Sequence, residues 1–158
     1  MIHLDNGWDW AAQEWFYDAV LTADADFQAS DFDLLGVSFY PFYNEDATLA
    51  ALGSSLEQLR EKYAKDVVVV ETDWPVSCPS PETPFPADLA DIPFSSEGQT
   101  AFLEKLAGVV GGAGGGGVYY WEPGWGGTGG LGSSCEDALM VEWDGGGVRE
   151  SVRVFGEI

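Results

Sequence analysis

A run of valines that stops at a carboxylate is the stretch of this sequence best suited to chemistry. Residues 67–70 are four consecutive valines, which predict a strand buried on both faces, as in parallel sheets. Glu71 ends the apolar run. In a barrel of alternating strands and helices, the carboxyl ends of the strands form the catalytic face, so a carboxylate there can take part in a reaction. The alternative is that Glu71 only marks where the strand leaves the core for solvent.

Polar and aromatic residues also gather where three other expected strands end. Strands are predicted near residues 2–5, 34–40, 67–71 and 118–122. In order, their carboxyl ends carry Asp5, Asn6 and Trp8; Ser38 and Tyr40; Glu71, Asp73 and Trp74; and Trp121, Glu122 and Trp125. A carboxylate among Tyr, Asp and Trp is typical of glycoside hydrolysis, in which a Glu attacks the anomeric carbon and aromatic faces hold the sugars. Tyr40 could donate its hydroxyl proton to Glu71 and hold its geometry.

The alternation of side chains along a strand predicts which residues share a face. If Glu71 points inward, we expect Val69 to point inward too, and Val70 to face the helices. The same rule pairs residues on other strands: His3 with Asp5, Ser38 with Tyr40, and Tyr119 with Trp121. We interpret His3, the single histidine, as a hydrogen-bonded interior residue rather than a ligand.

Other kinds of chemistry have weaker support. Without a second histidine or a grouped carboxylate pattern, we expect no transition-metal site and no cofactor, with a bound calcium ion as an open alternative although no carboxylate-rich loop of recognisable spacing calls for one. Ser133 and Ser134 lack a nearby histidine and the strand-to-helix turn that a serine nucleophile needs. The glycine-rich run 111–117 lacks the lysine and the following helix of a phosphate cradle, so we interpret it as a turn.

Four helical segments connect or follow the expected strands. Their predicted limits are residues 11–21, 47–65 with a cap at Asp46, Ser95 or Ser96 to about 110, and a short one near 148–155. The inward positions are expected to be Ala12, Trp15, Phe16, Ala19 and Val20 in the first, and Leu49, Leu52, Leu56 and Leu59 in the second. This alternation predicts an α/β fold with a parallel sheet.

The length of the chain, 158 residues, fits one domain but only half of an eightfold barrel, which takes about 250 residues. Two interpretations remain. The chain is either a small open parallel sheet complete in itself, or the second half, strands 5 to 8, of a TIM (β/α)8 barrel. In the second case residues 1–158 are a partial domain whose amino-terminal half is missing. An opening inside a strand, the absence of a signal peptide and the surplus of aromatic residues favour this interpretation.

The net charge limits the possible binding partners, and the placement of the cysteines indicates the cellular compartment. With 27 acidic and 6 basic residues the formal net charge is -21, which excludes nucleic acid and anionic membranes as partners. Cys78 and Cys135 both lie in loop-like sequence. This placement favours a disulfide and an extracellular compartment, with two free thiols as the alternative.

Five motifs in order resemble the second half of the fungal endo-β-1,4-galactanases of glycoside hydrolase family 53. They are IHLDNGW at 2–8, GVSFYPFY at 36–43, VVETDWP at 69–75, IPFS with EGQ at 92–99, and YWEP at 120–123. The resemblance implies a clan A barrel of eight strands and eight helices that cleaves galactan or arabinogalactan with retention of configuration. It also implies a secreted, monomeric intact enzyme.

The resemblance assigns roles to particular residues. Glu71 matches the nucleophile, Tyr40 a tyrosine beside it, and Trp121 a tryptophan under the sugar in the cleavage subsite. Cys78 and Cys135 match a fungal disulfide. The remaining candidates for substrate binding are Asp5, Asn6, Trp8, Asp73, Trp74 and Trp125.

One part of the family's machinery is missing from the sequence. The acid/base Glu of the family ends the fourth strand in an Asn-Glu pair, whereas this sequence begins at the fifth, and its Asn44-Glu45 lies in a loop. Retaining hydrolysis needs two carboxyl groups about 5–5.5 Å apart, so we expect the chain alone to be inactive. The alternatives are a non-catalytic galactan-binding module that uses its tryptophans as platforms, or a half-barrel that pairs with a second copy or with a separate amino-terminal half.

Overall fold

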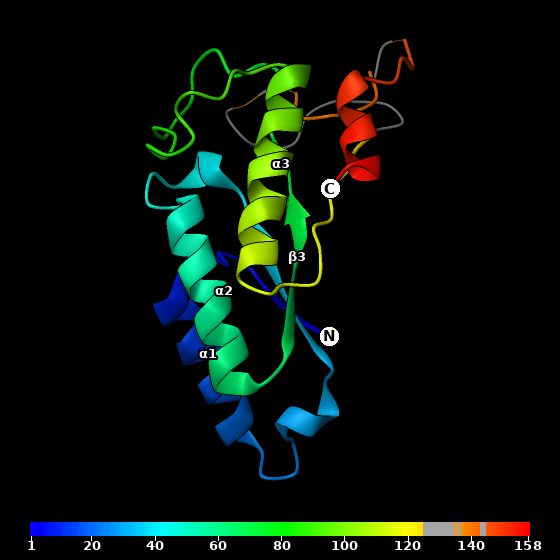
Figure 1. Ribbon diagram of the computed structural model, residues 1–158. Helices are drawn as coiled ribbons and strands as arrows, with labels where there is room; N and C mark the ends of the chain where they lie inside the picture. Colours follow the sequence, from blue (N-terminus) through cyan, green and yellow to red (C-terminus); the bar gives the residue numbers. More distant parts are fainter. Residues whose placement is uncertain (125–134, 136, 143–144) are drawn as a thin grey trace.

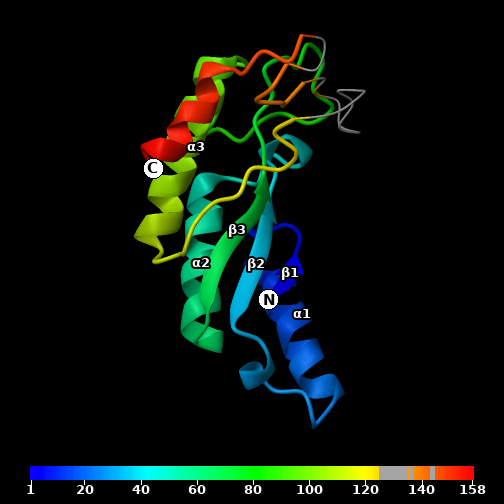
Figure 2. The same ribbon diagram turned by 90° about the vertical axis from the view of Figure 1, so that its right-hand side faces the viewer.

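The chain forms a parallel sheet with helices packed on one face (Figures 1 and 2). The computed structural model describes residues 1–124, 135, 137–142 and 145–158. The elements are β1 (Ile2–Leu4), α1 (Trp10–Ala23), η1 (Ala29–Asp31), β2 (Leu34–Phe39), η2 (Pro41–Tyr43), α2 (Leu49–Tyr63), β3 (Asp66–Thr72), α3 (Ser96–Gly112) and η3 (Glu150–Gly156). The predicted alternation of parallel strands and helices is confirmed.

The sheet has the order β1-β2-β3, and one irregularity in the pairing of β2 with β3 changes which side chains share a face. Val37 pairs with Val69, but the next residue, Ser38, pairs with Glu71. Val70 is therefore an extra residue in β3, a β-bulge that interrupts the alternation of side chains.

The predicted fourth strand, 118–122, is present only as an extended segment. It lies parallel to β3, with a single bridge between Val118 and Val69. The Tyr119 amide donates to Val69 O and the Trp121 amide to Thr72 O, each at 2.8 Å. A φ of 45° at Glu122, in the left-handed region, ends the extended backbone at its carboxyl end.

The buried face of α1 differs from the predicted one. Trp15 is 73% exposed, whereas Gln13 and Tyr17 are fully buried. The Gln13 amide donates to the backbone oxygens of Asp5 and Asn6, at 2.6 and 3.2 Å, so this polar residue ties α1 to the end of β1. The prediction is confirmed for Phe16, which packs against the core, and wrong for Trp15. It missed Gln13 because it used side-chain polarity alone, whereas the buried NH2 group of Gln13 is hydrogen-bonded.

Helices α2 and α3 follow the sequence pattern closely. All four predicted leucines of α2 are buried, but the cap is Thr48 rather than Asp46, since Thr48 Oγ1 accepts from the Ala51 amide at 2.9 Å. Ser95 caps α3 by accepting from the Gly98 amide at 3.1 Å, as predicted. The short helix expected near 148–155 is the 3-10 helix η3.

The core lies between the helices and one face of the sheet. Leu35, Val37 and Phe39 of β2 and Val67 and Val69 of β3 pack there against residues of α1, α2 and α3. Within the described part of the chain, every helix is too short or too polar to traverse a lipid bilayer.

Candidate functional site

The bulge at Val70 turns Glu71 away from the helices. Val69 belongs to the helix-facing core, whereas the two Val70 methyl groups lie 3.1 Å from where a Cβ of Gly36 would stand, on the opposite face. Glu71 contacts Ser38, which shares this second face with Gly36. The prediction that Val69 and Glu71 share a face is therefore wrong. The extra residue in β3 places Val70 and Glu71 on the same side.

Three side chains from two neighbouring strands surround the Glu71 carboxylate. Ser38 Oγ and the Tyr40 hydroxyl both donate to Glu71 Oε2, each at 3.1 Å. His3 Nδ1 lies 3.7 Å from Glu71 Oε1. Burial of Tyr40, followed by the nearby Glu71 and Asp73 carboxyls, raises the pKa of the Tyr40 hydroxyl. Tyr40 therefore keeps its proton and can act as a donor to Glu71, as the sequence suggested.

The two oxygens of Glu71 have different surroundings. Among the described residues, Oε2 accepts from both hydroxyl donors, while Oε1 accepts no hydrogen bond and has the His3 ring beside it. The Glu71 side chain is 24% exposed, so a ligand can reach it. One oxygen is thus held in place and the other is left to react.

His3 was expected to be an interior residue and is found beside the carboxylate. Its Nε2 is 2.7 Å from Ser38 Oγ, so the expected hydrogen bond exists, but 33% of the side chain is exposed. The sequence could have shown this position. Alternation along each strand, combined with the pairing of neighbouring parallel strands, places His3 beside Ser38.

Asp73 lies beneath the surface rather than on it. The residue is 2% exposed, and its Oδ1 has no hydrogen-bond partner among the described residues. Burial, and then the charge of Glu122, raise the pKa of Asp73 to about 8. This burial corrects the expectation that Asp73 is presented to a sugar.

Trp74 also differs from its expected place. It is fully buried, its Nε1 donates to Pro93 O at 2.9 Å, and its ring stacks on Phe102 with centroids 4.9 Å apart. A platform for a sugar needs an open ring face, so Trp74 is a core residue and not a platform.

The other candidates lie at the strand ends with varying exposure. Trp121 is 43% exposed, Asp5 and Asn6 are exposed, and Trp8 is partly buried. Asn6 adopts a φ of 48° in the turn that follows β1. Trp125 lies outside the described residues.

A disulfide fixes the loop that follows Glu71. Cys78 and Cys135 are bonded, with Cα atoms 4.3 Å apart, which confirms the pairing implied by the family resemblance. The bridge packs against Phe42, whose ring lies 5.7 Å from that of Tyr40. It therefore supports the side of the site that Tyr40 occupies.

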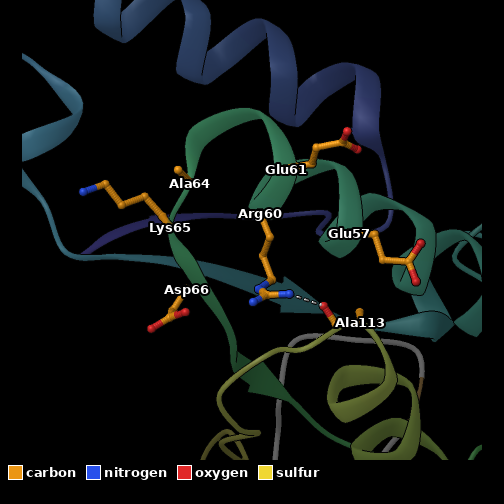
Figure 3. Close-up of a pocket in the computed structure, with 7 residues that line it drawn as sticks. All are labelled: Glu57, Arg60, Glu61, Ala64, Lys65, Asp66 and Ala113. Atoms are coloured by element: carbon orange, nitrogen blue, oxygen red, sulfur yellow. Dashed lines mark hydrogen bonds between the residues drawn. The ribbon is translucent and has the colours of Figure 1, made fainter.

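A hollow at the opposite end of β3 does not gather its polar groups (Figure 3). Its volume is about 380 Å³, and it is lined by Glu57, Arg60, Glu61, Ala64, Lys65, Asp66 and Ala113. Figure 3 shows the acidic side chains pointing apart, and Arg60 donates to the backbone oxygen of Ala113 at 2.9 Å. No group of three or more potential metal ligands occurs among the described residues.

Solved structures of similar proteins share this architecture. One, from a study of two fungal β-1,4-galactanases, matches with a TM-score of 0.95 at 50% identity, over 100% of this chain and 47% of that chain. The Ignisphaera aggregans GH53 catalytic domain matches at a TM-score of 0.72 and 20% identity, over 98% of this chain and 45% of that chain. The second match, at low identity, indicates a shared fold alone. The sheet and helices described above are therefore a partial TIM barrel, as predicted.

Similar sequences lead to the same group of proteins. The arabinogalactan endo-β-1,4-galactanases A of Emericella nidulans and of Aspergillus niger are each 60% identical to this chain, over all of it and 45% of the relative. The chain thus spans about half the length of the curated relatives it matches. The family model described as glycosyl hydrolase family 53 matches residues 1–155, nearly the whole chain, and the chain therefore belongs to glycosyl hydrolase family 53.

Proposed function

We propose that this chain is the nucleophile-bearing half of a secreted endo-β-1,4-galactanase that acts with retention of configuration. The observation that carries the proposal is the environment of Glu71, whose Oε2 is held by two hydroxyl donors while Oε1 accepts none from the residues that the structure describes. A carboxylate fixed through one oxygen is well placed to attack through the other. Two relatives that are each 60% identical to this chain are named as arabinogalactan endo-β-1,4-galactanases.

The proposed reaction has two steps. Glu71 Oε1 attacks the anomeric carbon of a galactose unit, the glycosidic C–O bond breaks, and the leaving oxygen takes a proton from a second carboxylic acid. Water, deprotonated by the same second group, then displaces Glu71 and releases the sugar. We assign the second group to the half of the barrel that the relatives have and this chain does not contain.

Sugar binding is proposed for residues at the same end of the sheet. Trp121 is the best-supported platform, because 43% of it is exposed beside β3. Asp5, Asn6 and Trp8 would contact neighbouring sugars from the end of β1. A neutral polysaccharide is compatible with a net charge of -21, whereas a polyanion is not. The disulfide is consistent with secretion.

The test is to complete the barrel. This chain would be joined by peptide ligation to the part of the Emericella nidulans relative that it does not match, and the product is called the completed barrel below. We expect the completed barrel to hydrolyse β-1,4-galactan, and the 158-residue chain alone to be inactive. Glu71→Gln in the completed barrel should abolish hydrolysis but retain binding of galactan.

Each other outcome has a definite meaning. Hydrolysis by the chain alone would refute the assignment of the second carboxylic acid to the absent half. Galactan binding without hydrolysis by a completed barrel that folds cooperatively would instead favour a non-catalytic binding module. Size-exclusion mass of the chain alone would decide whether it pairs with a second copy.

A further inference from the structure

We propose that His3 is a positioning residue for Glu71: with its proton on Nε2 it holds Ser38 against Glu71 Oε2, and with a second proton on Nδ1 it occupies Oε1 and blocks attack. This inference rests on the proposed function of Glu71 as nucleophile. His3 would then decide at which pH Glu71 can attack, in addition to holding the Ser38 hydroxyl in place.

The hydrogen-bond inventory fixes the proton on the imidazole. Ser38 has one hydroxyl hydrogen, and an ionised Glu71 can only accept, so that hydrogen is directed to Oε2. Ser38 Oγ can then only accept from His3 Nε2, which lies 2.7 Å away. His3 Nε2 must therefore carry hydrogen. The result is a chain of donors that runs from His3 through Ser38 to Glu71.

Whether His3 Nδ1 carries a proton decides whether Glu71 Oε1 is free to react. In neutral His3 with hydrogen on Nε2, Nδ1 carries a lone pair and cannot donate to Oε1, 3.7 Å away. A second proton would make Nδ1 a charged donor that faces a carboxylate oxygen. A small shift would then form an ion pair at the atom that has to reach the anomeric carbon. Protonated His3 would therefore compete with the substrate for Oε1.

The neighbouring groups leave Glu71 as the main charged partner of His3. Among the described residues, the titratable groups near His3 include Glu71 of β3, Asp73 just after it, Tyr40 after β2 and, on the strand of His3 itself, Met1 and Asp5. Tyr40 stays neutral because its pKa is raised by burial and by Glu71. His3 pairs in register with Gly36, and its ring reaches Ser38, two residues further along β2.

The first test measures the tautomer. The chain contains one histidine, so its ring signals need no assignment. This half would be labelled with 15N-histidine and studied by long-range 1H–15N NMR, alone and within the completed barrel. We expect the neutral ring to carry its proton on Nε2, and Ser38→Ala to reduce this preference. A proton on Nδ1, or a preference unchanged in Ser38→Ala, would overturn the proposal.

The second test measures activity in the completed barrel. His3→Ala should lower kcat about tenfold with little change in KM, because Ser38 loses its donor. His3→Gln keeps an N–H donor for Ser38 and cannot gain a proton. It should retain most of kcat and lose the fall in kcat toward acid pH that native His3 causes. Glu61→Gln, at the far end of the barrel, is the matched control and should leave kcat and the pH profile unchanged.

Two results would contradict the role of His3. One is an unchanged kcat in His3→Ala, and the other is a native acid limb in His3→Gln. A completed barrel that folds but is inactive with native His3 would refute the proposed function instead. In that case the NMR measurement still decides whether the donor chain exists.

Discussion

The two ends of β3 both carry a carboxylate, yet only one of them is built like a site. At the amino end, Asp66 borders a hollow of about 380 Å³ in which the charged side chains point apart (Figure 3). At the carboxyl end, Glu71 receives two hydroxyl hydrogen bonds and has an imidazole at 3.7 Å. Polar groups converge on one carboxylate at the carboxyl end and do not at the amino end. The presence of a hollow is therefore not enough to identify a functional site.

The topology explains this difference. At the carboxyl end, β1, β2 and β3 finish side by side, so His3, Ser38 and Glu71 come together from three strands. At the amino end, most residues of the hollow come from one turn of α2 and the loop after it. There Arg60 donates to the backbone oxygen of Ala113 instead of to a neighbouring carboxylate, whereas the parallel strands bring their side chains to a common edge.

The strongest test of the comparison replaces each carboxylate. Glu71→Ala in the completed barrel should lower kcat by roughly 10⁴-fold or more, because no covalent intermediate can form. Asp66→Ala should leave kcat within about twofold, since Asp66 contacts none of the groups around Glu71. Initial rates on β-1,4-galactan measure both effects. Equal losses in the two variants would show that the two ends do not differ in function.

The two tryptophans near the Glu71 end make the comparison more specific. Trp74→Ala should destabilise the completed barrel by about 3–5 kcal/mol, because the indole is fully buried against Phe102. Trp121→Ala should cost less than about 1 kcal/mol in stability but should weaken galactan binding. Urea unfolding and binding titrations separate the two effects. Weakened binding in Trp74→Phe, which keeps the core filled, would restore Trp74 as a sugar contact.

Much of the fold could be predicted because it depends on local pattern. The leucine spacing of α2, the valine run of β3 and the cap at Ser95 each specify their element without reference to the rest of the chain. The contact between Tyr40 and Glu71 also followed, since both end neighbouring strands. The disulfide followed from the family resemblance.

The errors arose where pairing between elements decides the outcome. The bulge at Val70 exists only relative to the register of β2. Alternation along β3 alone therefore placed Val69, instead of Val70, on the same face as Glu71. Gln13 is buried because two backbone oxygens at the end of β1 accept its hydrogens. Trp74 and Trp121 are the same residue type at similar positions, and what distinguishes them is that α3 and the loop before it cover Trp74.

The pH dependence of stability should reveal the buried carboxyl at the Glu71 end. The pKa of Asp73 is about 8 in the folded state, against its ordinary value of 3.8. Between these values the folded state holds a proton that the unfolded state has lost, so stability falls as pH rises from about 4 to 8. The slope is at most about 1.4 kcal/mol per pH unit and vanishes above the folded pKa.

The matched variant for this prediction is Asp73→Asn. An amide of the same shape does not ionise, so the slope assigned to Asp73 should disappear. Unfolding free energies of the completed barrel at pH 5, 6, 7 and 8 measure the effect. Parallel curves for the native and variant proteins would mean that Asp73 is ionised in the fold well below pH 8.

The smallest expected effect concerns the other end of β3, where the hollow would then have a structural role only. Arg60→Met removes a hydrogen bond of 2.9 Å to the Ala113 backbone oxygen but keeps much of the apolar stem. The free energy of unfolding should fall by about 1 kcal/mol, because the carbonyl loses a part-buried donor. The value of kcat should not change. A loss of activity without a loss of stability would mean that the amino end of β3 communicates with Glu71, and convergence at the carboxyl end would then no longer suffice to define the site.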